Sequence, residues 1–223
     1  MDVTGKVGSE VSMSKKISES VIRRLSLYLQ NLEDLEKEGF ATVSSEEMSG
    51  RSGTTAAQVR KDLSLFGSFG KRGLGYQVPE LAECIRKILG LDRRWNLGLI
   101  GAGRIGSALV EYDGFSQRGY DLVAIFDSAA PKVGKTRGGL TVRHVDEFEV
   151  VAREENIEIV ILSIPLEAVG SVMDRVTRAG VMGILSFAPT ELKVPDEATV
   201  RYVNMVMELE ALSFALSQQE EKV

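Results

Sequence analysis

The sequence predicts an α/β protein that combines an N-terminal winged helix-turn-helix domain with a Rossmann-like parallel-sheet domain and a C-terminal helix. Residues 17–65 show helical spacing of apolar side chains with capping residues. Residues 95–203 alternate short apolar runs with helical segments, which is typical of a parallel sheet with right-handed crossovers. The expected divisions are a disordered tail (1–13), a winged-helix domain (14–92), a Rossmann domain (93–203) and a C-terminal helix (204–223).

The composition is that of an ordinary globular protein, with 223 residues, 43% of them hydrophobic and 26% charged. No run approaches the ~18 apolar residues of a membrane span, and no signal peptide precedes the first helix, so a cytoplasmic protein is expected. A single cysteine, Cys84, and a single histidine, His144, exclude an internal disulfide and a cysteine or histidine metal cluster within one chain. No metal site is expected.

The net charge of −5 is unevenly distributed. Residues 1–95 carry 15 basic and 13 acidic side chains, whereas residues 96–223 carry 12 and 19. Within residues 51–76 there are five basic side chains and one acidic one. Because salt limits the reach of distant charges to about 10 Å, this patch could seat phosphates although the protein is acidic. The alternative is a solvated basic face.

Residues 44–65 predict a helix-turn-helix. Ser44 and Glu47 have the spacing of a capping box and open a short helix that ends near 50–53. Thr54 is expected to cap a second helix over 55–65. A longer helix precedes them over residues 17–38, and Gly39 is its natural stop. Two short helices joined by a glycine-containing turn are typical of this DNA-reading motif.

The segment that follows predicts a wing. Four glycines between 67 and 75 exclude a helix, and the aromatic and apolar residues between them suit a short hairpin within 66–76. Pro79 is then expected to start another helix that runs through Leu89. Residues 91–94 are interpreted as the linker.

The second half of the chain has the alternating strand and helix pattern that is typical of a dinucleotide-binding fold. Strands are expected at 96–100, 122–126, 157–162, 183–187 and 200–203, with helices from Arg104 and at 146–155 and 166–179. A last helix over 206–218 carries Leu209, Leu212, Phe214, Ala215 and Leu216. It is too apolar for a free end, so it must pack on something, and another subunit is one candidate.

The sequence Gly101-Ala102-Gly103-Arg104-Ile105-Gly106 follows a predicted strand and opens a predicted helix. In that context GxGxxG predicts a turn that seats a pyrophosphate on the positive end of the helix. Asp127 ends the next strand, where a carboxylate would accept the two ribose hydroxyls of the adenosine. A 2′-phosphate would meet like charge there, so NAD⁺ and NADH are favoured over NADP. The alternative is a glycine-rich turn with a surface aspartate.

Two further strand ends are expected at the same edge of the sheet. Ser163 and Pro165 follow one strand, and Ala188 and Pro189 follow another. In an open parallel sheet the carboxyl ends of the strands face the ligand. Each pair could equally be an ordinary loop.

No catalytic constellation emerges from the sequence. A dehydrogenase needs a general acid or base and a substrate domain, but only about 110 residues separate Trp95 from the last helix. His144 follows a predicted edge segment at 140–143 and is interpreted as a structural residue, and Cys84 as a packed small hydrophobe. The protein is therefore not expected to be an enzyme, and the cofactor is interpreted as a signal.

At this point a resemblance becomes specific. The chain resembles the Rex family of redox-sensing transcriptional repressors over residues 17–216. The motifs that carry the resemblance are VRKDLSLFG at 59–67, GKRGLGY at 70–76, GAGRIG at 101–106, FD at 126–127, GILSFAP at 183–189 and LSF at 212–214. It implies a bacterial homodimer whose C-terminal helix is swapped onto the partner. It also implies a repressor that binds double-stranded operator DNA, senses the NADH/NAD⁺ ratio, and closes and releases the operator when NADH binds.

The resemblance also implies a DNA-binding set. Recognition-helix cations would enter the major groove, where Arg and Lys donate to guanine O6 and N7. Wing residues would enter the minor groove, and hydroxyls near a helix N-terminus would contact phosphates. The set is Ser44, Ser45, Arg60, Lys61, Lys71, Arg72 and Gly73. The alternative for Arg60 and Lys61 is that they are only exposed helix charges.

The implied cofactor set is Gly101, Ala102, Gly103, Arg104, Ile105, Gly106, Tyr112, Asp127, Ser163, Pro165, Ala188, Pro189 and Met205. Tyr112 matches a family tyrosine that couples the nicotinamide to dimer geometry, and Met205 matches an apolar residue that reaches the partner's pocket. The chain departs from the family at the switch, because Gln30 and Asn204 stand where an Arg and an Asp commonly pair. A neutral amide pair would replace the ion pair there. The alternative class for the whole chain is a small NAD-dependent oxidoreductase with an accessory N-terminal domain, and a plain NAD-binding assembly subunit is a third possibility.

Overall fold

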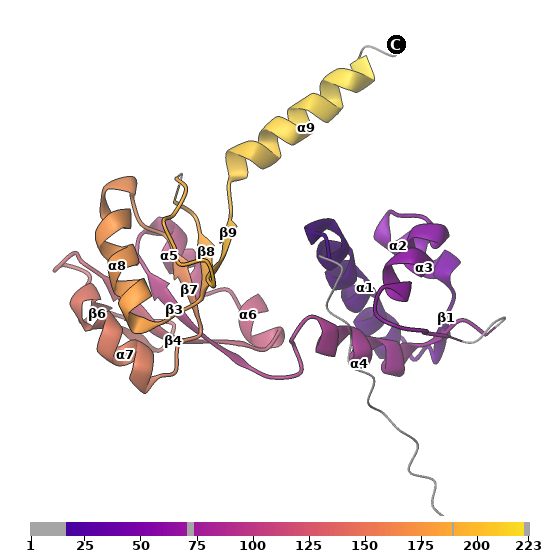
Figure 1. Ribbon diagram of the computed structural model, residues 1–223, viewed down its shortest axis with the longest axis horizontal. Helices are drawn as coiled ribbons and strands as arrows, with labels where there is room; N and C mark the ends of the chain where they lie inside the picture. Colours follow the sequence, from indigo (N-terminus) through magenta and orange to yellow (C-terminus); the bar gives the residue numbers. More distant parts are fainter. Residues whose placement is uncertain (1–16, 71–73, 189, 221–223) are drawn as a thin grey trace, which may run out of the picture. The chain divides into compact units, whose positions relative to one another are not determined.

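The structure is a computed structural model that describes residues 17–70, 74–188 and 190–220. The predicted tail at 1–13 lies outside the described residues. The chain divides into two compact units, Met1–Arg93 and Arg94–Val223, and each is described by itself (Figure 1).

The first unit is built on helix α1 (Glu19–Lys37), whose apolar side chains recur at helical spacing and face one core. Helix α2 (Ser45–Ser52), helix α3 (Ala56–Ser64) and helix α4 (Val78–Ile88) complete that core. The predicted stop of α1 is confirmed, because Gly39 adopts a φ of +83° directly after the helix cap.

Of the two helix caps predicted for the helix-turn-helix, one is confirmed and the other is displaced by one residue. The capping box is confirmed: Glu47 N donates to Ser44 Oγ at 3.1 Å, and Ser44 N donates to the Glu47 carboxylate at 2.7 Å. The prediction for the second helix is wrong by one position. Thr55, with extended backbone, accepts from Gln58 N at 3.1 Å, whereas Thr54 N is used in closing the preceding turn onto Ser49.

The predicted hairpin within 66–76 lies partly outside the described residues, at 71–73, and the described strand at its end pairs elsewhere. Strand β2 (Tyr76–Gln77) pairs antiparallel with β1 (Thr42–Val43), which lies before α2. Val43, the strand partner of Tyr76, is therefore 33 positions back along the chain, and local spacing carries no sign of so distant a pairing. Gly75 has to be glycine there, because its φ is +73° and a Cβ would overlap the carbonyl of Val43.

A buried carboxylate ties α3 to α1. Asp62, with 1% of its side chain exposed, accepts from Arg24 Nε at 2.6 Å and Nη2 at 2.8 Å. Tyr28 Oη donates to it at 2.9 Å, and Gln58 Nε2 donates at 2.7 Å. Burial opposes the charged form of Asp62, but these hydrogen bonds outweigh burial and lower its pKa. Burial, together with the bond to Asp62, raises the pKa of Tyr28 to about 12.

Replacing Asp62 with alanine should destabilise the first unit by about 3 kcal/mol, because Arg24 and Tyr28 lose a buried partner. Since the pKa of Asp62 is lower in the folded state, its contribution is present above the ordinary value of 3.8 and is lost as the pH falls below it. Chemical denaturation at neutral pH measures the loss. Asp34→Ala, which removes an exposed ion pair with Lys37, is the control and should cost under about 1 kcal/mol. An equal loss of unfolding free energy in the two variants would contradict a stabilising role for the buried contacts of Asp62.

The second unit contains a seven-stranded sheet in the order β5-β6-β4-β3-β7-β8-β9. All neighbouring strands are parallel except β5 and β6. Counted along the chain from β3, the parallel strands follow the order 3-2-1-4-5-6 of dinucleotide-binding folds. The strands are β3 (Trp95–Ile100), β4 (Tyr120–Asp127), β5 (Thr136–Arg137), β6 (Leu140–His144), β7 (Ile159–Leu162), β8 (Gly183–Ser186) and β9 (Thr199–Tyr202).

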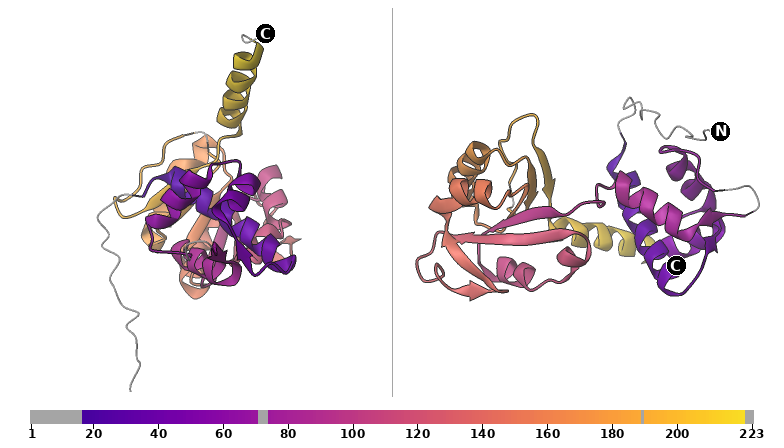
Figure 2. Two further views of the ribbon diagram at one scale, coloured as in Figure 1. Left: turned by 90° about the vertical axis from the view of Figure 1, so that its right-hand side faces the viewer. Right: turned by 90° about the horizontal axis from the view of Figure 1, so that it is seen from below.

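Helices cover both faces of this sheet because the strand side chains alternate between two apolar clusters. Helix α7 (Phe148–Glu154) and helix α8 (Val169–Ala179) pack on one face and lie side by side (Figure 2). Helix α5 (Arg104–Val110) and helix α6 (Gly114–Gln117) pack on the other. Short 3-10 turns at Val145–Glu147 and Leu166–Ala168 precede α7 and α8. The sequence did not predict α6.

The last helix, α9 (Met205–Glu220), continues from β9 and packs on none of the other described residues of its unit (Figure 1). Each residue from 205 to 219 is exposed. Its large apolar side chains are 53–67% accessible. No helix among the described residues is long and apolar enough to cross a membrane.

Candidate functional site

The glycine turn lies between β3 and α5, as the sequence predicts. Gly101 has a φ of +104°, and a Cβ there would overlap the carbonyl of Ser163. A Cβ on Gly106 would overlap the carbonyl of Gly101, so α5 starts in direct contact with the turn. These two positions admit only glycine because backbone atoms fill the space.

Gly103 differs from its neighbours. It caps α5 with extended backbone, and a Cβ built on it would meet nothing within 4 Å. The space in front of the first N–H groups of the helix is therefore open, and a side chain at this position would fill it. An open space at the positive end of a helix suits a pyrophosphate. Arg104 and Ile105 are exposed in the first turn of α5, and Ala102 is buried.

Asp127 ends β4 beside this turn, with 6% exposure. Its carboxylate accepts from Ala102 N, from Ala129 N and from Lys132 Nζ, each at 2.8 Å. Burial opposes ionisation, but the bond from Lys132 and the two backbone bonds outweigh it and lower the pKa of Asp127. The carboxylate thus holds the glycine turn in place.

Lys132 lies at this site, and the sequence did not predict its contact with Asp127. A carboxylate offers about four acceptor positions, and Asp127 already fills three of them. It therefore cannot accept both ribose hydroxyls alone, and the Lys132 ammonium supplies further donors beside it. The like charge that a 2′-phosphate would meet at Asp127 is thus partly offset by the neighbouring ammonium. A lysine five positions beyond the acidic residue was the available signal.

The other predicted strand ends are arranged around the turn in different ways. Ser163 Oγ donates to Gly101 O at 2.6 Å, so this hydroxyl supports the turn. Pro165 is exposed at the start of a 3-10 turn. Ala188 is buried in the core, and its N–H donates to Ser186 Oγ at 3.2 Å. Pro189 lies outside the described residues.

His144 is placed differently from the expectation. It is the last residue of β6, a parallel strand inside the sheet, and is the register partner of Asp127. The strand at the edge is β5, which the sequence did not predict. His144 Nδ1 accepts from Asp146 N at 3.3 Å and caps the turn that follows. It therefore lies at the carboxyl end of the strands but has a structural contact there.

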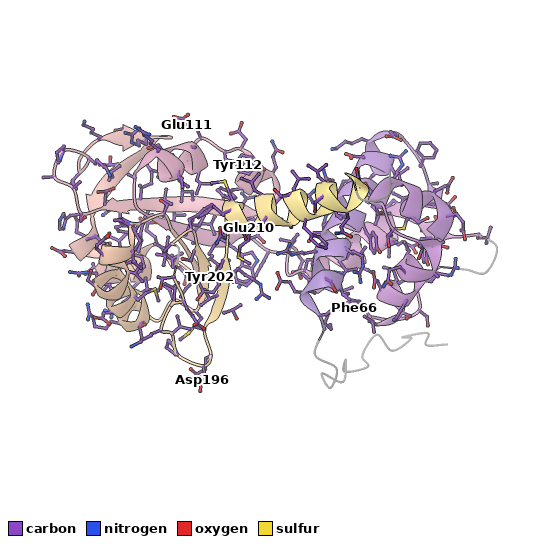
Figure 3. All side chains as sticks on the ribbon, turned by 90° about the horizontal axis from the view of Figure 1, so that it is seen from above. Phe66, Glu111, Tyr112, Asp196, Tyr202 and Glu210 are labelled. Atoms are coloured by element: carbon purple, nitrogen blue, oxygen red, sulfur yellow. The ribbon has the colours of Figure 1, made fainter. Side chains whose placement is uncertain are left out.

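The residues assigned to the switch are exposed. Tyr112 is 60% accessible (Figure 3). Its ring packs edge-on against that of Phe115, with the ring centroids 5.2 Å apart. A Cβ on Gly114 would overlap the Tyr112 ring, so glycine there makes room for it. Met205 is exposed at the start of α9. Asn204 Oδ1 accepts from Val206 N at 3.0 Å, which makes it the cap of α9. Gln30 lies exposed on α1 in the first unit.

The helix-turn-helix brings three of the predicted DNA-binding residues together. Arg60, on α3, donates from Nη1 to Ser45 Oγ at 2.7 Å and to Glu46 Oε1 at 3.0 Å. Ser44 adjoins them as the cap of α2. Lys61 is exposed on α3 and forms no ion pair within the described part of the chain. Lys71, Arg72 and Gly73 lie outside the described residues.

Comparisons with known proteins match segments of both halves of the chain. A family model described as a putative DNA-binding protein N-terminus matches residues 16–64, and one described as a CoA binding domain matches residues 92–190. A redox-sensing transcriptional repressor Rex from Carboxydothermus hydrogenoformans is 48% identical over 199 residues, which are 89% of this chain and 96% of that protein. A protein of the same name from Roseiflexus sp. is 44% identical over 89% of this chain and 90% of its own length.

This chain belongs to the Rex family. Among solved structures, the Rex-family repressor RSP in complex with β-NAD⁺ and operator DNA is 39% identical. Its TM-score is 0.86, with 93% of this chain and 95% of that chain covered. RSP in complex with β-NADH has a TM-score of 0.83 at 37% identity, covering 93% and 97%. The Rex relatives are named as repressors, so this member is a regulator.

Proposed function

We propose that the chain is a DNA-binding transcriptional repressor that senses the NADH/NAD⁺ ratio, binds operator DNA through its helix-turn-helix, and releases it when NADH binds. The single observation that carries this is the presence, in one Rex-family chain, of an open glycine cradle and a helix-turn-helix with exposed cations. A similar repressor, RSP, is described with NAD⁺ and operator DNA and with NADH. A repressor works where the chromosome is, so we place its action in the cytoplasm.

The residues around the cradle fit a dinucleotide. The turn from Gly101 to Gly106 would seat the pyrophosphate on backbone N–H groups. Asp127 and Lys132 would hold the adenosine ribose, the carboxylate as acceptor and the ammonium as donor. Ser163, Pro165 and Ala188, which follow the adjoining strands, would line the rest of the site.

Tyr112 and Met205 would receive the nicotinamide, which differs between the two redox states by one positive charge. An apolar, water-poor surrounding favours the uncharged ring, because an unpaired buried cation is costly. The exposed ring of Tyr112 and the flexible thioether of Met205 could form such a surrounding only if another surface covers them. Gln30 and Asn204 would pair as neutral amides, a contact worth about 1 kcal/mol. The cofactor would thus act as a signal, and we infer no catalytic residue.

We infer a homodimer in which α9 packs on the partner copy. Large apolar side chains lie on several sides of this helix and are exposed, and such side chains are normally buried. The same unit also holds an apolar cavity of about 1020 Å³ beside the amino ends of its strands. Leu97, Phe115, Ile159, Ile161 and Leu185 line it. The unit therefore offers both an unpartnered apolar helix and an apolar hollow.

Operator DNA should weaken NADH binding by the same factor by which NADH weakens operator binding. Coupling of about 1–3 kcal/mol corresponds to roughly 5- to 150-fold, and linkage makes it reciprocal. Titrating NADH into the protein with and without a bound operator duplex measures the factor. Equal NADH affinities would reject the sensing function, and turnover of NADH with a small carbonyl compound would indicate an enzyme instead.

Arg60→Ala should lower operator affinity by about 1–3 kcal/mol and relax base preference at one position of each half-site, because guanine recognition needs the guanidinium fork. Competition between the operator and single-base variants of it measures the preference. Lys61→Ala is the comparison and should lower the salt dependence if Lys61 serves phosphates. A uniform loss across all sequences for Arg60→Ala would make Arg60 a phosphate contact.

A further inference from the structure

The two cations on α3 have different surroundings. Arg60 is held from one end by two groups at the start of α2, the Ser45 hydroxyl and the Glu46 carboxylate. Lys61, the next residue, is exposed and forms no ion pair within the described segments. If both cations served only to attract phosphates, there would be no reason for the Arg60 side chain to be hydrogen-bonded to other described residues while that of Lys61 is not.

The contacts between Arg60, Ser45 and Glu46 form a closed triangle. Ser45 Oγ donates to Glu46 Oε2 at 3.1 Å, while the other carboxylate oxygen, Oε1, receives Arg60 Nη1 at 3.0 Å. Because Ser45 is buried, its hydroxyl group has a fixed position in this triangle. The pKa of Glu46 is lowered, first by its own backbone N–H and then by Arg60 and Ser45, so the carboxylate stays charged.

Only one nitrogen of the guanidinium is used in this triangle. Both bonds leave from Nη1, and Nε and Nη2 have no hydrogen bond to another described residue. The edge formed by Nε and Nη2 presents two parallel N–H groups, which is the geometry that reads guanine O6 and N7. The contact therefore leaves free the edge that base recognition requires.

From this geometry we propose that Glu46, with Ser45, is a positioning residue that orients Arg60 for base recognition and so determines operator specificity. The proposal rests on the DNA-binding function proposed above. An arginine held at one end loses less side-chain freedom when it meets a base and is less available to phosphates, which can take any of its nitrogens. Glu46 therefore lowers affinity for unspecific DNA relative to the operator.

The test compares wild-type chain with Glu46→Gln on two probes. The first is a palindromic duplex that the wild-type protein selects from a random library, and the second is a scrambled duplex of equal composition. We expect Glu46→Gln to lower the ratio of selected to scrambled affinity about two- to fivefold per half-site, the range of an exposed ion pair. Base preference at the position that Arg60 reads should relax, while the Tm stays unchanged.

Glu38→Gln is the matched control, because it removes the same charge and frees Arg51, which lies on α2 rather than on α3. Its affinity ratio should equal that of the wild type. In an Arg60→Ala background, Glu46→Gln should have no further effect on the ratio. Ser45→Ala should lower the ratio in the same direction as Glu46→Gln.

Two outcomes overturn the proposal. Equal ratios for Glu46→Gln and Glu38→Gln would show an effect of net charge alone. A higher operator affinity with an unchanged or higher ratio would show that Glu46 competes with DNA for Arg60. Failure of the wild-type chain to select any duplex would instead overturn the proposed repressor function, so the two failures are distinguishable.

Discussion

Replacing Gly103 with valine is expected to abolish the response to NADH while the second unit stays folded. The position has extended backbone, which valine adopts freely, and a Cβ there meets no protein atom within 4 Å. The branched side chain would occupy the open space in front of the N–H groups of α5. Loss of two charge-assisted hydrogen bonds to the pyrophosphate would cost about 3–6 kcal/mol, a factor of at least ~100 in Kd.

Calorimetric titration of NADH and thermal unfolding measure both halves of this prediction. Gly170→Ala is the control, since it adds a side chain on α8 where nothing lies within 4 Å, and NADH affinity should not change. Gly101→Ala should instead destabilise the unit, because its Cβ overlaps backbone and its φ is +104°. Normal NADH affinity in Gly103→Val would show that the pyrophosphate lies elsewhere.

The parts of the fold that follow from local chemistry could be predicted from the sequence. The capping box of Ser44 and Glu47 involves residues three apart, and the structure forms it with both bonds. The glycine turn at 101–106 could be predicted from spacing, because the strand, the GxGxxG sequence and the helix follow one another directly along the chain. The Rossmann topology likewise follows from the alternation of strands and helices.

Long-range pairings could not be predicted in this way. Tyr76 pairs with Val43 across 33 positions, and Asp62 contacts Arg24 across 38. An aspartate in an exposed-looking helix carries no local sign that it will be buried and paired. The contact of Lys132 with Asp127 depends on how the loop after β4 folds back, and the bond between Arg60 and Glu46 depends on the angle between two helices.

Asp127→Ala would be a less direct test of NADH binding than Gly103→Val. Its removal would take away an acceptor from Ala102 N and a partner from Lys132, so an alanine variant would disturb the turn as well as the ribose contact. The Gly103 variant avoids this difficulty because it removes no contact. Any loss of NADH binding in it is therefore attributable to the space in front of the helix.

The cradle and the reading helix lie in different units of the chain, so the cofactor state must reach the DNA through something that both share. In a two-fold dimer, the spacing of the two reading helices decides whether both half-sites can be bound at once. A helix exchanged between copies would fix that spacing. The most exposed apolar element among the described residues, α9, is suited to this role.

Leu212→Glu combined with Phe214→Glu on α9 should therefore convert the protein to a monomer and abolish tight operator binding. Both side chains are more than half exposed within one chain, so the substitutions cost nothing inside the protomer. In the dimer each would lose about 1.5–3 kcal/mol of apolar burial and would also bury a charge. Sedimentation measures the mass, and the wild-type operator duplex measures DNA binding. As a control, Gln218→Glu combined with Gln219→Glu adds the same two charges to the polar end of α9 and should leave the dimer intact. If the Leu212→Glu, Phe214→Glu protein remained a dimer, α9 would not be the element that joins the two copies.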